Sequence, residues 1–215
     1  MPTQAQKRFN PYATVTGLAE LLANEKDCQH ALWQRTHYQF EKKPNTYNPS
    51  EHEEMLIKRA IQLQDEGFIV YVENQNYFKY RSQNFDICVA GRPDIIATKD
   101  NWAVVEDIKT GKRKDSHKIQ SLLYMSMLPF APETQHLFKG HIPHGRLVYR
   151  DGVLDFPNWS VDREFRQRLQ QLIAMLCNSQ PPKSKPSNWE CRYCPIPFGY
   201  CSAKLDRSTE NPRLT

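Results

Sequence analysis

Two neighbouring segments decide the fold: Gly91-Arg-Pro-Asp94, and then Val104-Val-Glu-Asp107-Ile-Lys109-Thr-Gly111. The alternating pattern of residues 102–109 predicts a strand on which Asp107 and Lys109 share one face. A preceding strand over residues 85–98, joined to it across residues 99–101, brings Asp94 near Asp107. Two carboxylates that converge at the end of a sheet can hold Mg²⁺ or Mn²⁺, and an adjacent lysine can orient a water or offset charge on a phosphate. From these residues alone, a surface ion pair at the strand ends explains the pattern equally well.

The elements around this pair predict a sheet covered by helices. Residues 16–40 form one or two helices with Asp27 as a possible N-cap, and residues 42–49 form a polar loop. A Ser50–Glu53 capping box starts a helix that Gly67 ends. The remaining expected strands are 68–73 and 77–81, split by turn-forming residues 74–76, and a hairpin around Asp151-Gly152 that joins 146–150 to 153–156. The remaining expected helices are one that Asp115 or Ser116 caps and Pro129 ends, and an amphipathic one over 160–177. This order indicates an α/β or α+β core.

The helix that follows the central strand places Gln120 and Tyr124 four residues apart, and therefore on one face. His117 lies on roughly the same side. Gln120 can hydrogen-bond a phosphate or the attacking water. Tyr124 can contact a DNA strand, although a tyrosine beside Leu123 and Leu128 is also an ordinary core residue.

The ordered set of Gly-Arg-Pro-Asp94, Asp107-x-Lys109-Thr-Gly and Gln120-x-x-x-Tyr124 resembles the PD-(D/E)XK nuclease superfamily, and within it the RecB-like branch. The resemblance implies a restriction-endonuclease-like core with a mixed sheet, and metal-dependent phosphodiester hydrolysis. Asp94 and Asp107 would hold Mg²⁺ or Mn²⁺, Lys109 would activate or position the water, and Gln120 would assist. In that branch a histidine on the helix before the sheet is often a further ligand.

The matching segment here is Glu51-His52-Glu53-Glu54. His52 is the expected ligand from the family pattern, and Glu53, nearer the middle of the apolar stripe, is its substitute. Glu106 faces away from Asp107 on a regular strand, so it is left out of the metal site.

Three cysteines near the C-terminus form the array Cys191-x2-Cys194-x6-Cys201. Thiolates at this spacing suit a soft metal or an iron–sulfur cluster, and Cys28 is the natural fourth ligand. The set resembles the iron–sulfur subset of RecB-like nucleases, namely the CRISPR-associated single-domain exonucleases and the AddB-type nuclease domains. The resemblance implies a 4Fe–4S cluster of mainly structural role that fastens residues 14–40 to residues 181–205. Zinc bound by four thiolates, or by three with a histidine such as His141 or His144, is the alternative. Cys88 and Cys177 are expected to be core residues.

The composition fits one soluble domain over residues 1–215, with approximately residues 50–130 as its catalytic core. The chain has 215 residues, 39% hydrophobic and 25% charged, with a net charge of +5. Mean hydropathy is −0.73, and no signal peptide or membrane span is visible, so a cytoplasmic protein without membrane contact is expected. Lys112 and Arg113, with Lys114 and Lys118, form a basic patch beside the site that can bind DNA phosphates or simply be solvated. Trp33, Tyr38 and Tyr193 could stack on unpaired bases or be core residues.

The resulting hypothesis is a metal-dependent DNA nuclease. The family likeness favours exonuclease action on single-stranded DNA, in CRISPR spacer acquisition with the integrase complex and hence in antiviral defence. Two alternatives stand beside it: a repair or recombination nuclease outside CRISPR, and a non-cutting DNA-binding scaffold subunit. A zinc-ribbon regulatory protein is a third.

Overall fold

The computed structural model describes residues 5–41 and 48–205. Its helices are α1 Val15–Leu22, α2 Gln29–His37, α3 Ser50–Asp65, α4 Asp115–Met127, α5 Arg163–Leu176 and α6 Asn188–Tyr193. Its strands are β1 Gln6–Lys7, β2 Tyr12–Thr14, β3 Tyr38–Gln39, β4 Ile69–Val72, β5 Phe78–Arg81, β6 Cys88–Gly91, β7 Ile95–Lys99, β8 Trp102–Lys109, β9 His144–Tyr149 and β10 Gly152–Phe156. This is the mixed α/β fold that the sequence predicts.

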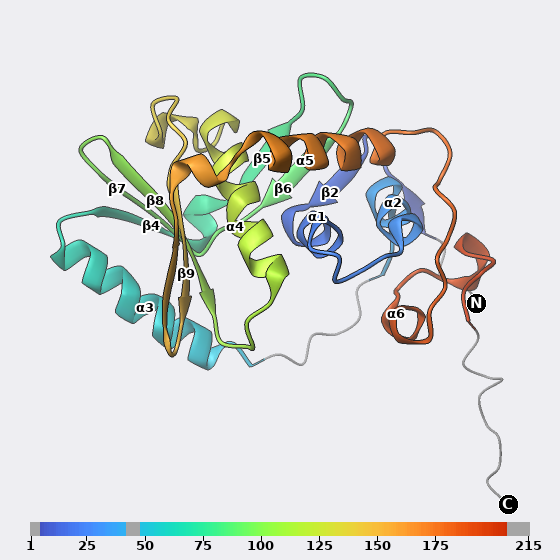
Figure 1. The fold of residues 1–215 in the computed structure, drawn as a ribbon, viewed down its shortest axis with the longest axis horizontal. Coiled ribbons are helices and arrows are strands. Elements are labelled where there is room, and N and C mark those ends of the chain that lie inside the picture. The colour runs from blue at the N-terminus through green and yellow to red at the C-terminus, as the bar shows by residue number, and fades with distance from the viewer. Residues whose placement is uncertain (1–4, 42–47, 206–215) are drawn as a thin grey trace, which may run out of the picture.

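The central layer is a five-stranded sheet in the order β10-β9-β8-β7-β4. It is mixed, because β8 pairs with β9 in parallel and with β7 in antiparallel fashion. A three-stranded sheet, β2-β6-β5, stands beside it, and β1 pairs with β3. Figure 1 shows the larger sheet with α3 at one side and α1, α2 and the C-terminal segment at the other.

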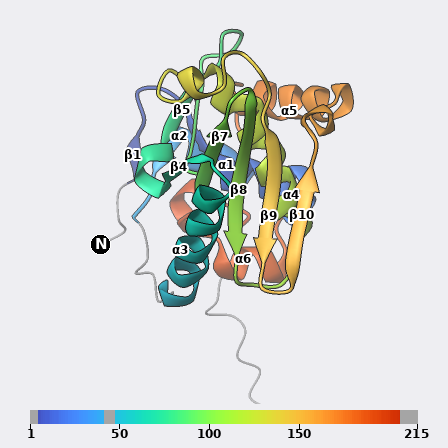
Figure 2. The ribbon, with the colours of Figure 1, turned by 90° about the vertical axis from the view of Figure 1, so that its left-hand side faces the viewer.

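Helices cover both faces of the five-stranded sheet. Leu56 and Leu63 of α3 pack on one face against Val104 and Ile108 of β8. Val105, from the opposite face of β8, joins the larger core formed with α1, α4 and α5. Figure 2 shows α3 in front of the strands and α1 and α4 behind them. The alternation of β8 therefore directs odd-numbered residues toward α4 and even-numbered ones toward α3.

The expected single strand over residues 85–98 is wrong, and its break lies at the candidate site. The chain leaves the three-stranded sheet after Gly91 and enters the five-stranded sheet at Ile95. Pro93 has no N–H to give to a sheet, so Arg92–Asp94 form a bend and not a strand. Asp94 consequently lies where the two sheets meet.

Several predicted helix starts are also shifted. The N-cap of α3 is Pro49, so Ser50 is already helical and makes no capping box with Glu53. Cys28, not Asp27, is the N-cap of α2, and Lys114, not Asp115 or Ser116, is the N-cap of α4. Gly67 follows α3 with φ of 84°, as its predicted role as a helix terminator requires. Most of the predicted 42–49 loop, residues 42–47, lies outside the described residues.

Within residues 5–41 and 48–205, no helix has both the length and the apolar character needed to cross a bilayer.

Candidate active site

An open cleft of about 590 Å³ lies at the C-terminal end of β8. It contains six of the residues that the sequence singles out, which come from α3, the β6–β7 bend, β8 and α4. They are His52, Asp94, Asp107, Lys109, Gln120 and Tyr124. Residues that are far apart in the chain therefore meet in one solvent-accessible space.

Asp107 and Lys109 point from β8 toward α4 and form an ion pair. The Lys109 ammonium also donates to Gln120 Oε1 at 3.1 Å, and Gln120 Nε2 donates to the Tyr124 hydroxyl at 3.0 Å. The Tyr124 hydroxyl donates in turn to the Arg92 carbonyl at 3.3 Å. This chain of bonds fixes the lysine between a carboxylate and an amide.

Asp94 is held from the opposite side of the cleft. Its Oδ2 accepts from the Ile108 N–H at 2.6 Å and lies 3.2 Å from His52 Nε2. The Ile108 N–H belongs to the strand that carries Asp107, so the bond ties the two carboxylates together.

Gly91 permits this close packing. A Cβ atom at Gly91 would lie 2.7 Å from Val15, 2.8 Å from Tyr124 and 2.9 Å from Phe78. Any side chain there would push α1 or α4 away from the bend, which explains the glycine of the Gly-Arg-Pro-Asp94 segment.

Burial and charge shift the protonation of the site. Burial raises the pKa of Asp107 to about 6, with Lys109 opposing and Asp94 adding to the rise. The hydrogen bond with Asp94 raises the pKa of His52, against a smaller opposing effect of burial. Burial likewise raises the pKa of Tyr124, which keeps its hydroxyl protonated and able to donate. The site therefore gathers negative charge that a cation would stabilise.

The donor set fits a divalent metal ion. Asp94 and Asp107 supply the carboxylate oxygens that Mg²⁺ and Mn²⁺ prefer, and His52 supplies a nitrogen. In this structure the Lys109 ammonium provides the positive charge next to Asp107. Across the described ranges, however, no three His, Cys, Asp or Glu side chains are gathered closely enough to hold a metal as they stand.

Other predicted residues lie at or beyond the rim. Glu53 is exposed, which differs from the inward position expected of it as a substitute ligand. His117 Nδ1 lies 2.9 Å from the Tyr149 hydroxyl, and burial lowers the pKa of His117 to about 4. Lys112 and Arg113 are exposed, and Arg113 pairs with Asp151 at 3.0 Å.

Sequence reasoning missed Asn76, which it assigned to a turn. Asn76 is fully buried, and its amide donates to the carbonyl oxygens of Tyr71, Pro93 and Asp94 at 2.9, 3.2 and 3.2 Å. The backbone N–H of Glu73 adds a bond to the Asp94 carbonyl at 2.9 Å. Asn76 thus holds the bend that presents Asp94, and no local signal marks an asparagine for this role.

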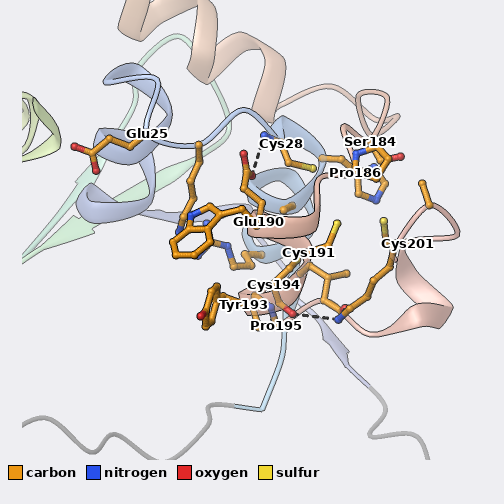
Figure 3. A pocket seen from close by; sticks show the side chains of 18 residues that line it. Glu25, Cys28, Ser184, Pro186, Glu190, Cys191, Tyr193, Cys194, Pro195 and Cys201 are labelled. Carbon is orange, nitrogen blue, oxygen red and sulfur yellow. Dashed lines mark hydrogen bonds between the residues drawn. The ribbon is translucent and has the colours of Figure 1, made fainter. Parts of the chain in front are cut away.

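The four cysteines predicted to act together line one cavity of about 140 Å³. Cys28 comes from the start of α2, and Cys191, Cys194 and Cys201 come from the segment around α6 (Figure 3). All four are free thiols in this structure. The cavity therefore lies between residues 14–40 and residues 181–205, the two segments that the sequence predicts to be joined.

The histidines of the zinc alternative lie elsewhere. His141 and His144 line a different cavity, where the His144 ring stacks on Trp102 at a centroid distance of 3.8 Å. Cys88 and Cys177 are half-buried, not fully buried as a core position implies, and Cys177 packs against the main core. Trp33 is buried and stacks on His37, so it is a core residue.

The fold and the site together define an α/β protein in which two carboxylates and a lysine line one open cleft. The family model of the PD-(D/E)XK nuclease superfamily matches residues 14–198, most of the chain. The protein therefore belongs to the PD-(D/E)XK nuclease superfamily.

Two solved structures are similar in part. SSO0001 is 20% identical, with 93% of this chain and 89% of that chain covered and a TM-score of 0.39. An alkaline exonuclease, LHK-Exo, from Laribacter hongkongensis is 13% identical, with 77% and 87% covered and a TM-score of 0.43. No curated protein matches significantly. The assignment to the superfamily rests on the family model.

Proposed function

We propose that the protein is a metal-dependent DNA nuclease that acts as an exonuclease on single-stranded DNA. The observation that carries the proposal is the convergence of Asp94, Asp107 and Lys109 in one open cleft, beside His52 and Gln120. Superfamily membership supports nuclease chemistry, and the positions of these residues supply the groups that such chemistry needs.

Each side chain has a role that its contacts support. Asp94, Asp107 and His52 would hold Mg²⁺ or Mn²⁺, which when bound acts as a Lewis acid on the scissile phosphate. The Lys109 ammonium, fixed by Gln120, positions the attacking water and offsets charge that develops on the phosphate. Gln120 orients the lysine through one end of its amide and the Tyr124 hydroxyl through the other.

We further propose that Cys28, Cys191, Cys194 and Cys201 hold a 4Fe–4S cluster. Four free thiols lining one cavity supply the ligand set that such a cluster takes. The thiols are not already in ligand geometry, because no metal-binding group of three is present among the described residues. His141 and His144 line a different cavity, which argues against either of them as a zinc ligand beside these cysteines, while a four-thiolate zinc site remains the alternative.

The cysteine arrangement also underlies the proposed place in biology. We assign the nuclease to CRISPR spacer acquisition alongside an integrase complex, on the resemblance of the four-cysteine set to CRISPR-associated exonucleases. The rival assignment is DNA repair or recombination outside CRISPR. Adjacency of the gene to integrase genes would support the first assignment, and adjacency to recombination genes would support the second.

The nuclease proposal predicts that Mg²⁺ or Mn²⁺ will support hydrolysis of end-labelled single-stranded DNA, and that Asp107→Ala, Asp94→Ala or Lys109→Ala will abolish it. Loss of one charge-stabilising group typically costs about 10²–10³ in rate. His52→Ala should reduce the rate and weaken Mn²⁺ binding. Glu53→Ala is the matched control, since Glu53 is the next residue on α3 but is exposed.

Denaturing gels that resolve the products would follow the reaction and separate cutting from the ends from internal cutting. Full activity of the Asp107 variant, free of contaminating nuclease, would contradict the assigned site. A wild-type protein that binds DNA but never cuts it would support the scaffold alternative. A larger loss in Glu53→Ala than in His52→Ala would move the ligand role to Glu53.

A further inference from the structure

The C-terminal segment exposes large aromatic side chains. Trp189 and Tyr193 of α6 are 72% and 62% exposed, and Phe198 is 55% exposed. The Trp189 and Tyr193 rings meet at 5.3 Å with an interplanar angle of 69°. Exposed apolar side chains that cluster in this way mark interaction surfaces more often than isolated ones do.

We propose that Lys26, Arg35, Trp189 and Tyr193, which we call the tail surface, bind single-stranded DNA whose cleaved bond lies in the Asp94–Asp107 cleft. The unpaired bases stack on Trp189 and Tyr193, and the phosphates pass the basic side chains. The inference rests on the proposed nuclease function and adds to it the path of the substrate outside the cleft.

The tail surface lies next to the elements that form the cleft. Its four residues line the same cavity as Glu25. Glu25 Oε1 accepts from the Ser116 N–H at 2.8 Å, in the first turn of α4. The same helix carries Gln120, and the basic residues Lys112–Lys114 connect it to Lys109. Figure 3 shows Glu25 and Tyr193 on the left of the view and Cys28 and Cys201 on the right. Cys191 and Cys194 are labelled between them, so Tyr193 borders the cysteines of the cavity.

The charges of the tail surface favour a polyanion. Both carboxylates in the lining are engaged by backbone N–H groups: Glu25 by Ser116, and Glu190 by Asp27 and Cys28 at 2.8 and 3.3 Å. Lys26 pairs with Glu20 at 2.6 Å, whereas the buried Arg35 Nε has no hydrogen-bond partner among the described residues. Lys183 and Lys185, just before α6, are exposed, and the Arg192 guanidinium lies 5.8 Å from the centre of the Tyr193 ring. A positive groove with aromatic rings is the usual form of a single-strand binding site.

A protein partner is the other class of occupant that exposed aromatics can accept. The cationic surroundings and the link to α4 favour DNA, because an apolar protein face requires neither. The experiment below makes the protein partner one of its outcomes.

The test is fluorescence anisotropy of dye-labelled oligo-dT of about 15 nucleotides, a length within single-strand site sizes. The full chain is titrated in EDTA, where metal-dependent cutting cannot occur. Trp189→Ala and Tyr193→Ala should each raise the Kd about tenfold, the range expected for loss of one stacked base. Trp189→Phe should retain most of the affinity. Arg35→Gln should reduce the slope of log Kd against log salt by about one.

Two control variants test whether a loss of DNA affinity is specific to an aromatic ring at position 189. Trp159→Ala removes a tryptophan that is 75% exposed but lies in the turn before α5, and it should leave the Kd unchanged. Trp189→Leu keeps the apolar bulk without an aromatic ring, and it should bind as weakly as Trp189→Ala. Duplex DNA, whose bases are already stacked, should show no dependence on Trp189.

The outcomes separate this proposal from the nuclease proposal. An unchanged Kd in Trp189→Ala overturns the tail surface as a DNA site, even where the wild type cuts DNA, and leaves a protein partner as the occupant of the exposed aromatics. Tight binding of oligo-dT by Trp189→Leu overturns base stacking. The converse result is also possible. If the wild type binds oligo-dT but never cuts DNA, and Trp189→Ala binds it weakly, the nuclease proposal is refuted and the tail surface is supported.

Discussion

Asp107 is a carboxylate whose buried position costs stability once it is charged. It is 4% exposed, and burial raises its pKa from 3.8 to about 6. The folded protein therefore holds the Asp107 proton more tightly than the unfolded chain does. Without a metal, the contribution of Asp107 to the free energy of unfolding falls as the pH rises from about 4 to about 6, and remains reduced above that range.

This cost predicts that Asp107→Asn will unfold at a higher temperature than the wild type in EDTA at neutral pH, while losing nuclease activity. The advantage should grow between about pH 4 and pH 6 and then stay constant. It should not exceed about 3 kcal/mol, at roughly 1.4 kcal/mol per pKa unit, and loss of the Lys109 ion pair will reduce it. Thermal unfolding across this pH range measures it. A variant less stable than the wild type at pH 7, with an intact fold, would contradict this account.

The residues of the site differ in how far they could be predicted. Strand alternation is a local rule, and it predicts that Asp107 and Lys109 share one face. Helical spacing is local as well, and it predicts that Gln120 and Tyr124 share one face. Asn76 could not be found in this way, since its partners Pro93 and Asp94 become neighbours only after two sheets have formed. The ion pair of Arg59 with Glu106 could not be predicted for the same reason, because the two residues lie 47 positions apart in the sequence.

Among the elements, β8 is the one that organises both faces of the sheet. Asp107 and Lys109 face the cleft, while Glu106, fully buried, faces α3. Both Glu106 oxygens accept from Arg59 at 2.7 and 2.8 Å, and Arg146 of β9 adds a bond at 2.7 Å. The prediction that Glu106 faces away from Asp107 is confirmed. The ion pair between Glu106 and Arg59 links the central strand to α3, the helix that carries His52.

Removing Arg59 should therefore weaken the fold more than an ordinary substitution does. Arg59→Met leaves Glu106 buried with only Arg146 to neutralise it, and we expect the free energy of unfolding to fall by about 3 kcal/mol. Adding Glu106→Leu should recover part of that loss, because the uncompensated charge disappears. Urea unfolding of the single and double variants measures both effects. A loss under about 1 kcal/mol in the single variant would show that the ion pair contributes little.

Prediction of elements succeeded where the signal was continuous and failed at breaks. The expected strand over residues 102–109 agrees with β8. The predicted hairpin also forms, but its turn is Arg150-Asp151 and not Asp151-Gly152, because Gly152 already pairs with Tyr149 in β10. The strand expected over residues 85–98 divides between two sheets instead, because Pro93 interrupts it and Asn76 holds the bend. A change of sheet leaves no periodic signal in the sequence.

At the scale of the whole molecule, residues 27–33 contact residues 178–200 through hydrogen bonds as well as through the cavity that the cysteines line. Glu190 binds the backbone of Asp27 and Cys28, and the His30 ring lies 3.0 Å from the Pro182 carbonyl and 3.1 Å from the Tyr200 carbonyl. The Trp33 indole donates to the Asn178 carbonyl at 2.9 Å. These hydrogen bonds join the N-terminal and C-terminal segments independently of the four cysteines.

The proposed cluster would add a covalent tie to these contacts. A bond network from Cys28 to Cys191 closes a loop of most of the chain, and a cross-link of that length restrains the unfolded state by about 4–5 kcal/mol. Cys28→Ala, Cys191→Ala, Cys194→Ala and Cys201→Ala should each lower the iron content of anaerobically purified protein and its resistance to urea. The Glu190 and His30 contacts should still keep the segment protected from proteolysis in native buffer.

Cys88→Ala and Cys177→Ala are the matched controls, because both thiols lie outside the shared cavity and should leave iron unchanged. Iron and sulfide analysis decides between the possible outcomes. Undiminished iron in Cys28→Ala would remove Cys28 from the ligand set, and zinc in place of iron would make the site a four-thiolate zinc centre. Rapid proteolysis of residues 181–205 in every cysteine variant would mean that the cluster, and not the Glu190 and His30 contacts, holds the two ends together.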